Sequence, residues 1–288
     1  MKSTAKFIFR SILLVATVSF VLSGCKKKEK EDNDTSSASD NAFAEASYND
    51  MSTIGDQAST GSMTSYRFGG DGSLLSACAV ISFGNAVTSD NDTMNVDFGS
   101  TNCLCSDGRY RRGMIRVIYT GGLLYRDSGM TLNFYPINYF VNDNQIQGTK
   151  TVINRGHIAG QLTWDISVTG TIILASNGGT ITWNSTRQRK LLAGETTYNG
   201  PINWAIAKVG VTGNASGVSA NGESYQANII TQLVRDFSCS LNRKHFVQGT
   251  LDFIPGSKPT RHIDFGTGVC DDIATVMINN NTYTVHMH

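Results

Sequence analysis

Apolar and polar residues alternate along most of the chain after Tyr66, which is typical of β-strands with one buried and one solvated face. The clearest run is 162–169, Leu-Thr-Trp-Asp-Ile-Ser-Val-Thr, in which every second residue is apolar. This alternation predicts that Trp164 lies on the buried face. Trp183 shares the parity of Ile181 and is expected to point inward as well.

Short polar turns separate the strand-like runs. Asn and Gly residues, which tolerate the left-handed backbone of tight turns, gather at 142–144, 177–179, 221–222 and 279–281. Strands joined by such turns pair antiparallel. The sequence therefore predicts an all-β fold, a long antiparallel meander that forms a sandwich or a barrel.

A helical period precedes the β region. Between Asp40 and Ala58, apolar residues recur at helical spacing at Ala44, Tyr48 and Met51. Ser39 or Asp40 could cap the start, and Gly55 and Gly61 indicate the end. One short amphipathic helix is expected before the strands.

The N-terminus carries an export pattern. An apolar run from Phe7 to Leu22 follows and overlaps a basic start without acids, whose cations are Lys2, Lys6 and Arg10. The run is shorter than the roughly 20 residues of a membrane-spanning helix. Residues 22–25, Leu-Ser-Gly-Cys, resemble the lipobox of bacterial prolipoproteins, which implies a signal peptide over 1–24 and acylation of Cys25. The alternative is an ordinary cleaved signal peptide followed by a chance cysteine.

A polar, highly charged stretch follows Cys25 and begins Lys-Lys-Lys-Glu-Lys-Glu-Asp. This composition cannot build a core, so residues 25–40 are expected to form a disordered tether before a domain over 41–288. Such stretches resemble the signals that send lipoproteins of Bacteroidota to the outer face of the outer membrane. Lys26 differs from the aspartate that retains lipoproteins in the inner membrane of other bacteria. We expect an outer-membrane, surface-exposed lipoprotein, with the periplasmic face as the alternative.

The charge balance bears on partners and on domain organisation. Removal of the signal peptide leaves 21 Lys and Arg (24 − 3) against 23 Asp and Glu, a net charge near −2. This balance lacks the basic excess that nucleic-acid binding requires. The sequence contains 29 glycines and only 4 prolines, a composition that favours strands joined by glycine turns. We expect a single β domain; two pseudo-symmetric halves are the alternative.

Five cysteines remain once Cys25 carries lipid: Cys78, Cys103, Cys105, Cys239 and Cys270. Export places them where disulfides persist, and their odd number leaves one thiol unpaired or paired with another chain. We expect Cys78 to pair with Cys103 or Cys105, and Cys239 with Cys270. Zinc is a weaker alternative because the usual two-residue spacing of its cysteine ligands is missing.

Two segments of the chain echo each other. Residues 97–103, Asp-Phe-Gly-Ser-Thr-Asn-Cys, and 264–270, Asp-Phe-Gly-Thr-Gly-Val-Cys, share their first three residues and their last. They could mark equivalent strand ends, each with its own disulfide, or match by chance. Asp-Phe-Gly is not the kinase motif here, because the glycine loop, the strand lysine and the catalytic-loop signature are absent.

The ordered motifs together resemble a lipoprotein family of Bacteroidota without an assigned activity. Besides the lipobox and the tether, the resemblance covers residues 97–103, 107–113, 139–142, 148–149, 183–189, 270–271 and 283–285. It implies the localisation and a single β-rich unit. It brings no catalytic residue, cofactor or substrate.

Catalytic and metal chemistry have few candidates. Of the five histidines at 157, 245, 262, 286 and 288, His286 and His288 could bind a metal as an i, i+2 pair, or be solvated residues at the terminus. A glycan hydrolase needs two carboxylates at a set separation. The available ones include Glu195, Glu223, Asp97, Asp165 and Asp264. No residue is assigned a catalytic or metal-binding role, and no cofactor is expected.

The ligand-binding candidates are Arg109, Arg187, Arg189 and Trp204. Arg187 and Arg189 share one strand face, and Arg109 begins a cluster of arginines at 109–116. Guanidinium groups could hold a phosphate or carboxylate of a glycan or lipid; cross-strand pairing with acids is the alternative. Trp204 could stack on a sugar if exposed or belong to the core if buried.

Three functions follow from these features. The first is a non-enzymatic binding or envelope-structural lipoprotein. The second is a lipid or lipopolysaccharide carrier, in which the face of strand 162–168 would line an open trough. The third is a glycan hydrolase, in which two carboxylates would converge in a cleft.

Overall fold

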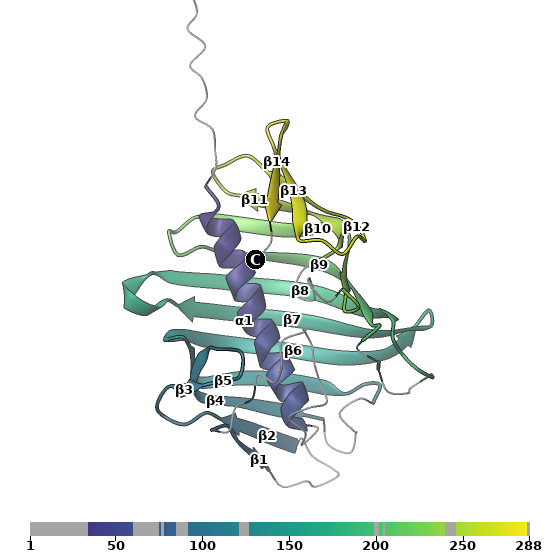
Figure 1. The fold of residues 1–288 in the computed structure, drawn as a ribbon. Helices are drawn as coiled ribbons and strands as arrows, with labels where there is room; N and C mark the ends of the chain where they lie inside the picture. Colours follow the sequence, from purple (N-terminus) through teal and green to yellow (C-terminus); the bar gives the residue numbers. More distant parts are fainter. Residues whose placement is uncertain are drawn as a thin grey trace, which may run out of the picture. The chain divides into compact units, whose positions relative to one another are not determined.

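The computed structural model describes residues 34–59, 75, 78–84, 92–120, 127–198, 202–203, 205–239 and 246–286. They form one long helix and a 14-stranded antiparallel sheet in which each strand pairs with the next along the chain, except that the short β3 pairs with β4 beside β2 (Figure 1). The elements are α1 (Ser36–Ser59), β1 (Val80–Phe83), β2 (Asp92–Asp97), β3 (Cys103–Leu104), β4 (Tyr110–Tyr119), β5 (Thr131–Val141), β6 (Asn144–Ile158), β7 (Gln161–Ile173), a 3-10 turn η1 (Ala175–Asn177), β8 (Thr180–Ala193), β9 (Lys208–Val218), β10 (Ser224–Asp236), β11 (Gln248–Pro255), β12 (Arg261–Thr267), β13 (Ile273–Ile278) and β14 (Asn281–His286).

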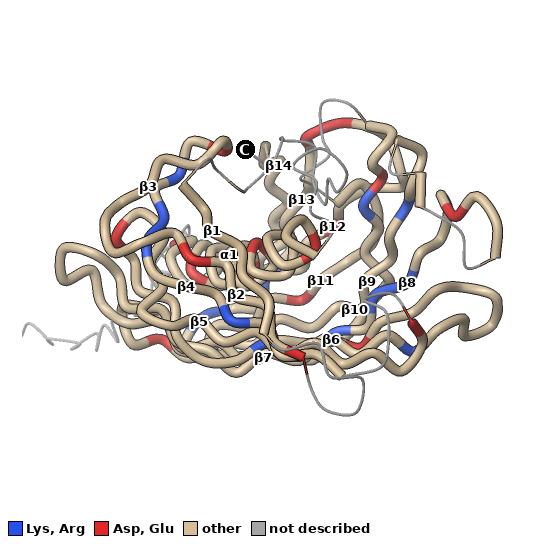
Figure 2. The backbone as a smooth tube through the Cα atoms, turned by 90° about the horizontal axis from the view of Figure 1, so that it is seen from below, with Lys and Arg blue, Asp and Glu red and all other residues tan. Residues whose placement is uncertain are grey.

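The sheet bends around the helix. Seen from below, α1 lies on the concave side, with β6 and β7 beneath it and the outer strands rising on both sides (Figure 2). Strands β1 and β14 each have one neighbour, so the sheet stays open and is not closed into a barrel. The predicted all-β antiparallel meander with a helix before it is confirmed; it forms one open sheet, not the barrel that was one of its two predicted shapes.

The predicted alternation holds over residues 166–169 of β7. Ile166 and Val168 are buried on the concave side of β7, whereas Ser167 and Thr169 are exposed. Before these residues the alternation breaks, because the polar Thr163 is fully buried and Trp164, predicted to be core, is only partly buried, beside the irregular register between Asn154 and Gly156. Trp183 is 2% exposed and points inward, as predicted. Each of the four predicted Asn and Gly turns connects two consecutive strands, at 142–143, 177–179, 220–222 and 279–280.

The apolar stripe of α1 fills the concavity. Its members are fully buried: Ala44, Tyr48, Met51, Ile54 and Ala58. The ring of Tyr48 stacks on Trp183 with centroids 5.6 Å apart, and its hydroxyl donates to the Gln147 carbonyl at 2.7 Å. Gly170 lies directly beneath Tyr48, where a Cβ would overlap the ring. The helix can approach the sheet this closely because β7 has no side chain at that point.

The helix starts earlier than predicted but ends at Ser59, one residue beyond the predicted Ala58. It begins at Ser36, whose backbone N–H donates to the Asp34 carboxylate at 2.9 Å, so residues 36–40 are helical and not tether. The ion pair of Asp34 with Lys258, at 2.7 Å, holds this end against the sheet. Gly55 lies inside the helix, where its missing side chain leaves room for Phe134. The Asp34 cap is a local contact that the sequence analysis overlooked, whereas the ion pair of Asp34 with Lys258 is long-range.

Both expected disulfides form. Cys78 pairs with Cys103 and Cys239 with Cys270, while Cys105 is a free, buried thiol. Of the two partners that the sequence left open for Cys78, the structure shows Cys103 and not Cys105.

The two Asp-Phe-Gly segments also share a local conformation. The carboxylate of Asp97 accepts the N–H of Gly99, and that of Asp264 accepts the N–H of Gly266, both at 2.8 Å. Both glycines adopt positive φ, 82° and 86°. The echo therefore marks the same local backbone conformation at the end of β2 and within β12, each followed by a disulfide cysteine.

The contact between Tyr48 and β7 predicts a specific sensitivity at Gly170. Gly170→Ala places a methyl group against the Tyr48 ring, and we expect it to lower the free energy of unfolding by about 2 kcal/mol. Chemical denaturation followed by circular dichroism measures the change.

A double variant tests the cause of this loss. In the background Tyr48→Leu, which lacks the ring, Gly170→Ala should cost much less, because the two residues are in contact and their effects are not additive. Equal costs in the two backgrounds would contradict this account of the helix packing.

Candidate functional site

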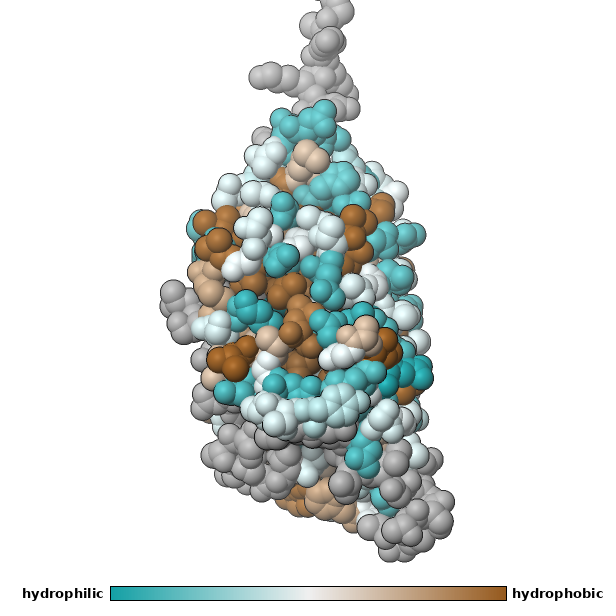
Figure 3. Space-filling model, turned by 90° about the vertical axis from the view of Figure 1, so that its right-hand side faces the viewer, coloured by the Kyte–Doolittle hydropathy of each residue, from teal (hydrophilic) through white to brown (hydrophobic). Residues whose placement is uncertain are grey.

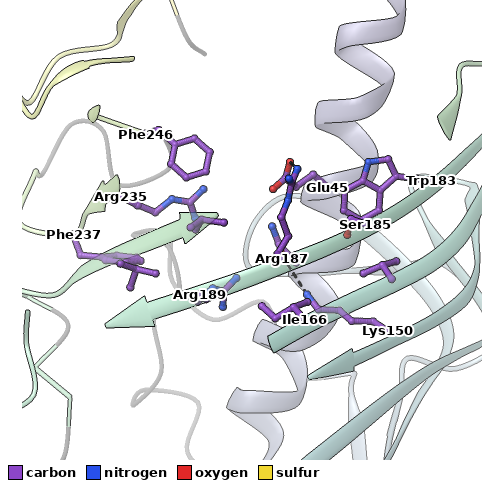
Figure 4. Close-up of a pocket in the computed structure, with 14 residues that line it drawn as sticks. Glu45, Lys150, Ile166, Trp183, Ser185, Arg187, Arg189, Arg235, Phe237 and Phe246 are labelled. Carbon is purple, nitrogen blue, oxygen red and sulfur yellow. Dashed lines mark hydrogen bonds and ion pairs between the residues drawn. The ribbon is translucent and has the colours of Figure 1, made fainter. Parts of the chain in front are cut away.

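A pocket lies on the concave side of the sheet at the edge of α1 (Figure 4). Its cavity measures about 40 Å³. Strands β6 to β10 and the helix supply its lining, which combines apolar and charged side chains: Glu45, Asn49, Lys150, Ile166, Val168, Trp183, Ser185, Arg187, Arg189, Val209, Val211, Arg235, Phe237 and Phe246.

Strand β8 supplies four consecutive inward-facing positions of this pocket. They alternate along the strand as Trp183, Ser185, Arg187 and Arg189. Arg187 lies opposite Ile166 of β7, and Arg189 lies opposite Val211 of β9. The period of two therefore places both guanidinium groups among apolar neighbours, and neither faces bulk water on the convex side.

Arg187 has more hydrogen-bond donors than partners. It is 6% exposed, and its Nη2 lies 3.5 Å from the Glu45 carboxylate of α1. Its Nε and Nη1 are buried without a hydrogen-bond partner, as is the hydroxyl of Ser185. Figure 4 shows Arg187 extended beside Glu45 at the helix edge. Strand β8 thus brings three buried polar atoms without hydrogen-bond partners to one cavity: Arg187 Nε, Arg187 Nη1 and Ser185 Oγ.

Arg235 enters the pocket from β10. Its guanidinium lies 5.4 Å from the ring centre of Phe246, and its Nε is buried without a partner. Burial, followed by the nearby charge of Arg189, lowers the pKa of Arg235 to about 10. The shift reflects mainly the burial of Arg235, and the neighbouring charge of Arg189 adds to it.

Lys150 of β6 closes the side of the pocket beneath the helix. The residue is 1% exposed, and its ammonium donates to the Tyr48 carbonyl at 3.0 Å and to the Asn49 side chain at 3.1 Å. Burial, followed by the charge of Arg189, lowers the pKa of Lys150 to about 7, although Asp56, Glu45 and Asp50 oppose the shift. Lys150 is therefore a titratable contact between sheet and helix.

The pocket lining is electrostatically unbalanced. Four cations line it, and Glu45 is its one carboxylate. The charged groups are surrounded by apolar and buried side chains, and electrostatic interactions are stronger in such surroundings. The arrangement attracts a negatively charged group.

The other two ligand-binding candidates do not join this pocket. Arg109 forms an ion pair with Asp50 of α1. Beside it, the fully buried Arg111 binds both oxygens of Asp107 at 2.7 Å, so this arginine cluster has acidic partners, as the alternative interpretation predicted. Trp204 lies outside the described residues.

The candidate carboxylates have separate structural partners. Glu195 pairs with His157, Glu223 with Lys258 and Asp165 with Arg155, each at 2.7 or 2.8 Å. Asp97 and Asp264 each accept the backbone N–H of the glycine two residues later. These side chains are therefore engaged at different places in the fold.

The described ranges contain no group of three His, Cys, Asp or Glu side chains placed to hold a metal ion. His286 pairs with Asp272 at 3.1 Å, and His288, like His245, lies outside the described residues. No helix within these ranges is long and apolar enough to cross a membrane.

Comparisons of the chain with protein-family models, with curated proteins and with solved structures found no match. The site is therefore interpreted from its own geometry.

The sequence analysis selected Arg187 and Arg189 but missed Lys150, Ser185 and Arg235. A signal for the two missed cations was present. Lys150 has the parity of Ile146, and Arg235 that of Leu233, so each places a charge on the apolar face of its strand. Charges at such positions are rare unless they have a partner or a function.

Lys150 gives stability a defined pH dependence. Its pKa is about 7 in the folded protein and near 10.5 when unperturbed, so the unfolded chain binds more protons between these values. The free energy of unfolding therefore rises with pH in this window. We expect the wild type to gain about 1 kcal/mol per pH unit relative to Lys150→Met between roughly pH 7.5 and 9.5.

Urea denaturation at several pH values measures this gain. The matched control is Lys208→Met, which removes a half-exposed lysine and should leave the difference from wild type nearly constant with pH. A constant difference for Lys150→Met as well would contradict the coupling.

Proposed function

We propose that this chain is a lipid-anchored outer-membrane lipoprotein whose β domain binds a ligand and does not convert it. The observation that supports ligand binding is the pocket beside α1, which joins apolar walls to a few charged groups. Ligand sites are typically concave and largely apolar, with few polar groups that fix orientation. Acid–base catalysis would need paired titratable groups directed at a substrate. Lys150, the lining residue whose pKa is about 7, instead donates to the Tyr48 carbonyl and the Asn49 side chain beneath the helix.

The anchor rests on the sequence. Leu-Ser-Gly-Cys at 22–25 follows an apolar run, and the charged residues after Cys25 match the expected export signal. Several acyl chains anchor stably, since each buried methylene contributes about 0.8 kcal/mol. A location at the outer face of the outer membrane, with the domain held beyond its lipid anchor, fits a protein that captures ligands from its surroundings.

The lipid carrier is the second candidate. Apolar side chains gather in the middle of the face that Figure 3 presents, between polar ones. Ile158, Tyr198 and Ile206 are large exposed apolar residues that lie at the end of β6, in the segment after β8 and just before β9, respectively. However, α1 occupies the trough, and Ile166 and Val168 are 6% and 4% exposed. A whole lipid would therefore require the helix to leave, whereas a small ligand would not.

The anchor predicts the fate of a Cys25 variant. Cys25→Ser removes the acceptor of the lipid, so we expect the protein to move from the membrane fraction to the soluble fraction, or to remain as an unprocessed precursor. Detergent phase partitioning and metabolic labelling with a fatty acid measure both properties. Label incorporation and membrane retention equal to the wild type would contradict the anchor.

The pocket predicts saturable binding of a small amphiphilic probe. We expect 1-anilinonaphthalene-8-sulfonate to bind the folded protein with one-to-one stoichiometry in a fluorescence titration. Val211→Trp fills the cavity and should weaken binding by about tenfold or more, equivalent to about 1.4 kcal/mol.

The matched control is Ile153→Trp, a partly buried residue that lines a different surface hollow with Thr151 and Thr212. It should leave binding unchanged. Equal effects of the two substitutions, or no saturable binding, would refute this pocket as the ligand site.

A further inference from the structure

The structure points to an oxyanion site in the pocket, and this inference rests on the proposed ligand-binding function. We propose that Arg187 and Ser185 bind one phosphate, sulfate or carboxylate group, either free or as the acidic end of an amphiphile, and that Arg235 adds positive charge from β10 on the other side of the cavity.

The unpaired donors carry the proposal. Arg187 Nε and Nη1, Ser185 Oγ and Arg235 Nε are all buried without hydrogen-bond partners. More than nine in ten buried polar groups in proteins have a partner, and each unpaired group costs about 1–3 kcal/mol, more when it is charged. Four such atoms at one cavity are therefore a costly arrangement unless an acceptor enters.

The donors specify what kind of acceptor fits. A guanidinium has only donors, in a planar fork that matches the oxygens of a carboxylate or phosphate. The hydroxyl of Ser185 can add a third donor two residues away on the same face of β8. Metal cations are disfavoured, because the lining holds four cations and one carboxylate.

The cavity has a matching size. Its volume is about 40 Å³, and one water molecule requires roughly 10–15 Å³ by the same measure. The space therefore corresponds to about three waters, comparable to one tetrahedral oxyanion. Phe237 and Phe246 stand at one side of the cavity in Figure 4, where an apolar remainder of the ligand could pack.

Glu45 of α1 lies beside the proposed anion site. Its carboxylate lies 3.5 Å from Arg187 Nη2, a long contact made from the helix, and its side chain is 25% exposed. It leaves Nε and Nη1 of Arg187 free. Glu45 therefore competes with an entering oxyanion for the same guanidinium.

Competition against bound anilinonaphthalene sulfonate tests the site in the purified mature protein. We expect inorganic phosphate to displace the probe from the wild type. Arg187→Gln should weaken phosphate at least about tenfold, since a hydrogen bond to a charged group is typically worth that much. The matched control is Arg155→Gln, which removes a half-exposed arginine that is paired with Asp165 on the convex face.

A second variant keeps the proposal testable if Arg187→Gln fails to fold. Glu45→Gln removes the competing carboxylate and should strengthen phosphate binding several-fold. Octyl phosphate then distinguishes the sources: tighter competition than phosphate indicates the acidic end of a lipid, and equal competition indicates a free oxyanion.

Two results would overturn the oxyanion site while leaving ligand binding intact. One is probe binding that phosphate does not displace, and the other is phosphate affinity that neither Arg187→Gln nor Glu45→Gln changes. Absence of any probe binding would instead reject the proposed function itself.

Discussion

Tyr48 of α1 lies against Gly170 of β7, at a point where the sheet has no side chain and its ring can stack on Trp183. The rest of the domain depends on this contact. A single open sheet leaves its concave apolar face unprotected, and α1 covers that face with a fully buried stripe. The hydrophobic effect thus holds the helix in place, and the hydroxyl of Tyr48 satisfies the Gln147 carbonyl inside it.

The packing of α1 on the sheet also decides which charged side chains face each other. The helix carries four acidic residues and no basic one: Asp40, Glu45, Asp50 and Asp56. The concave face beneath it carries the cations. Where the helix covers them, acids face them, as Asp50 faces Arg111 at 3.6 Å. At its edge, Arg235 and part of Arg187 remain without acidic partners, because no further element of the described chain brings a carboxylate there. The proposed anion site is a consequence of where the helix stops covering the sheet.

Sequence reasoning predicted what depends on local pattern. Parity, Asn and Gly residues and cysteine spacing predicted the turns, the inward side of β7 around Ile166 and Val168, the inward position of Trp183 and the Cys239–Cys270 disulfide. They left the partner of Cys78 open between Cys103 and Cys105, and the structure pairs it with Cys103. Sequence reasoning missed the early start of α1 at Ser36, because it overlooked the local Asp34 cap and could not foresee the long-range ion pair of Asp34 with Lys258. It could not bring Lys150 and Arg235 beside Arg187 either, since that requires the pairing of β6 to β10 and the irregular register between Asn228 and Leu233.

Nuclear magnetic resonance of the arginine side chains tests the central claim most directly. The Nε–H signal of Arg187, assigned by its loss in Arg187→Lys, reports whether an acceptor enters the pocket. The account predicts that titration with inorganic sulfate shifts this signal and that of Arg235 together, saturably, and leaves the signal of Arg155 unchanged. Signals of Arg187 and Arg235 that stay fixed at saturating sulfate and phosphate would contradict it.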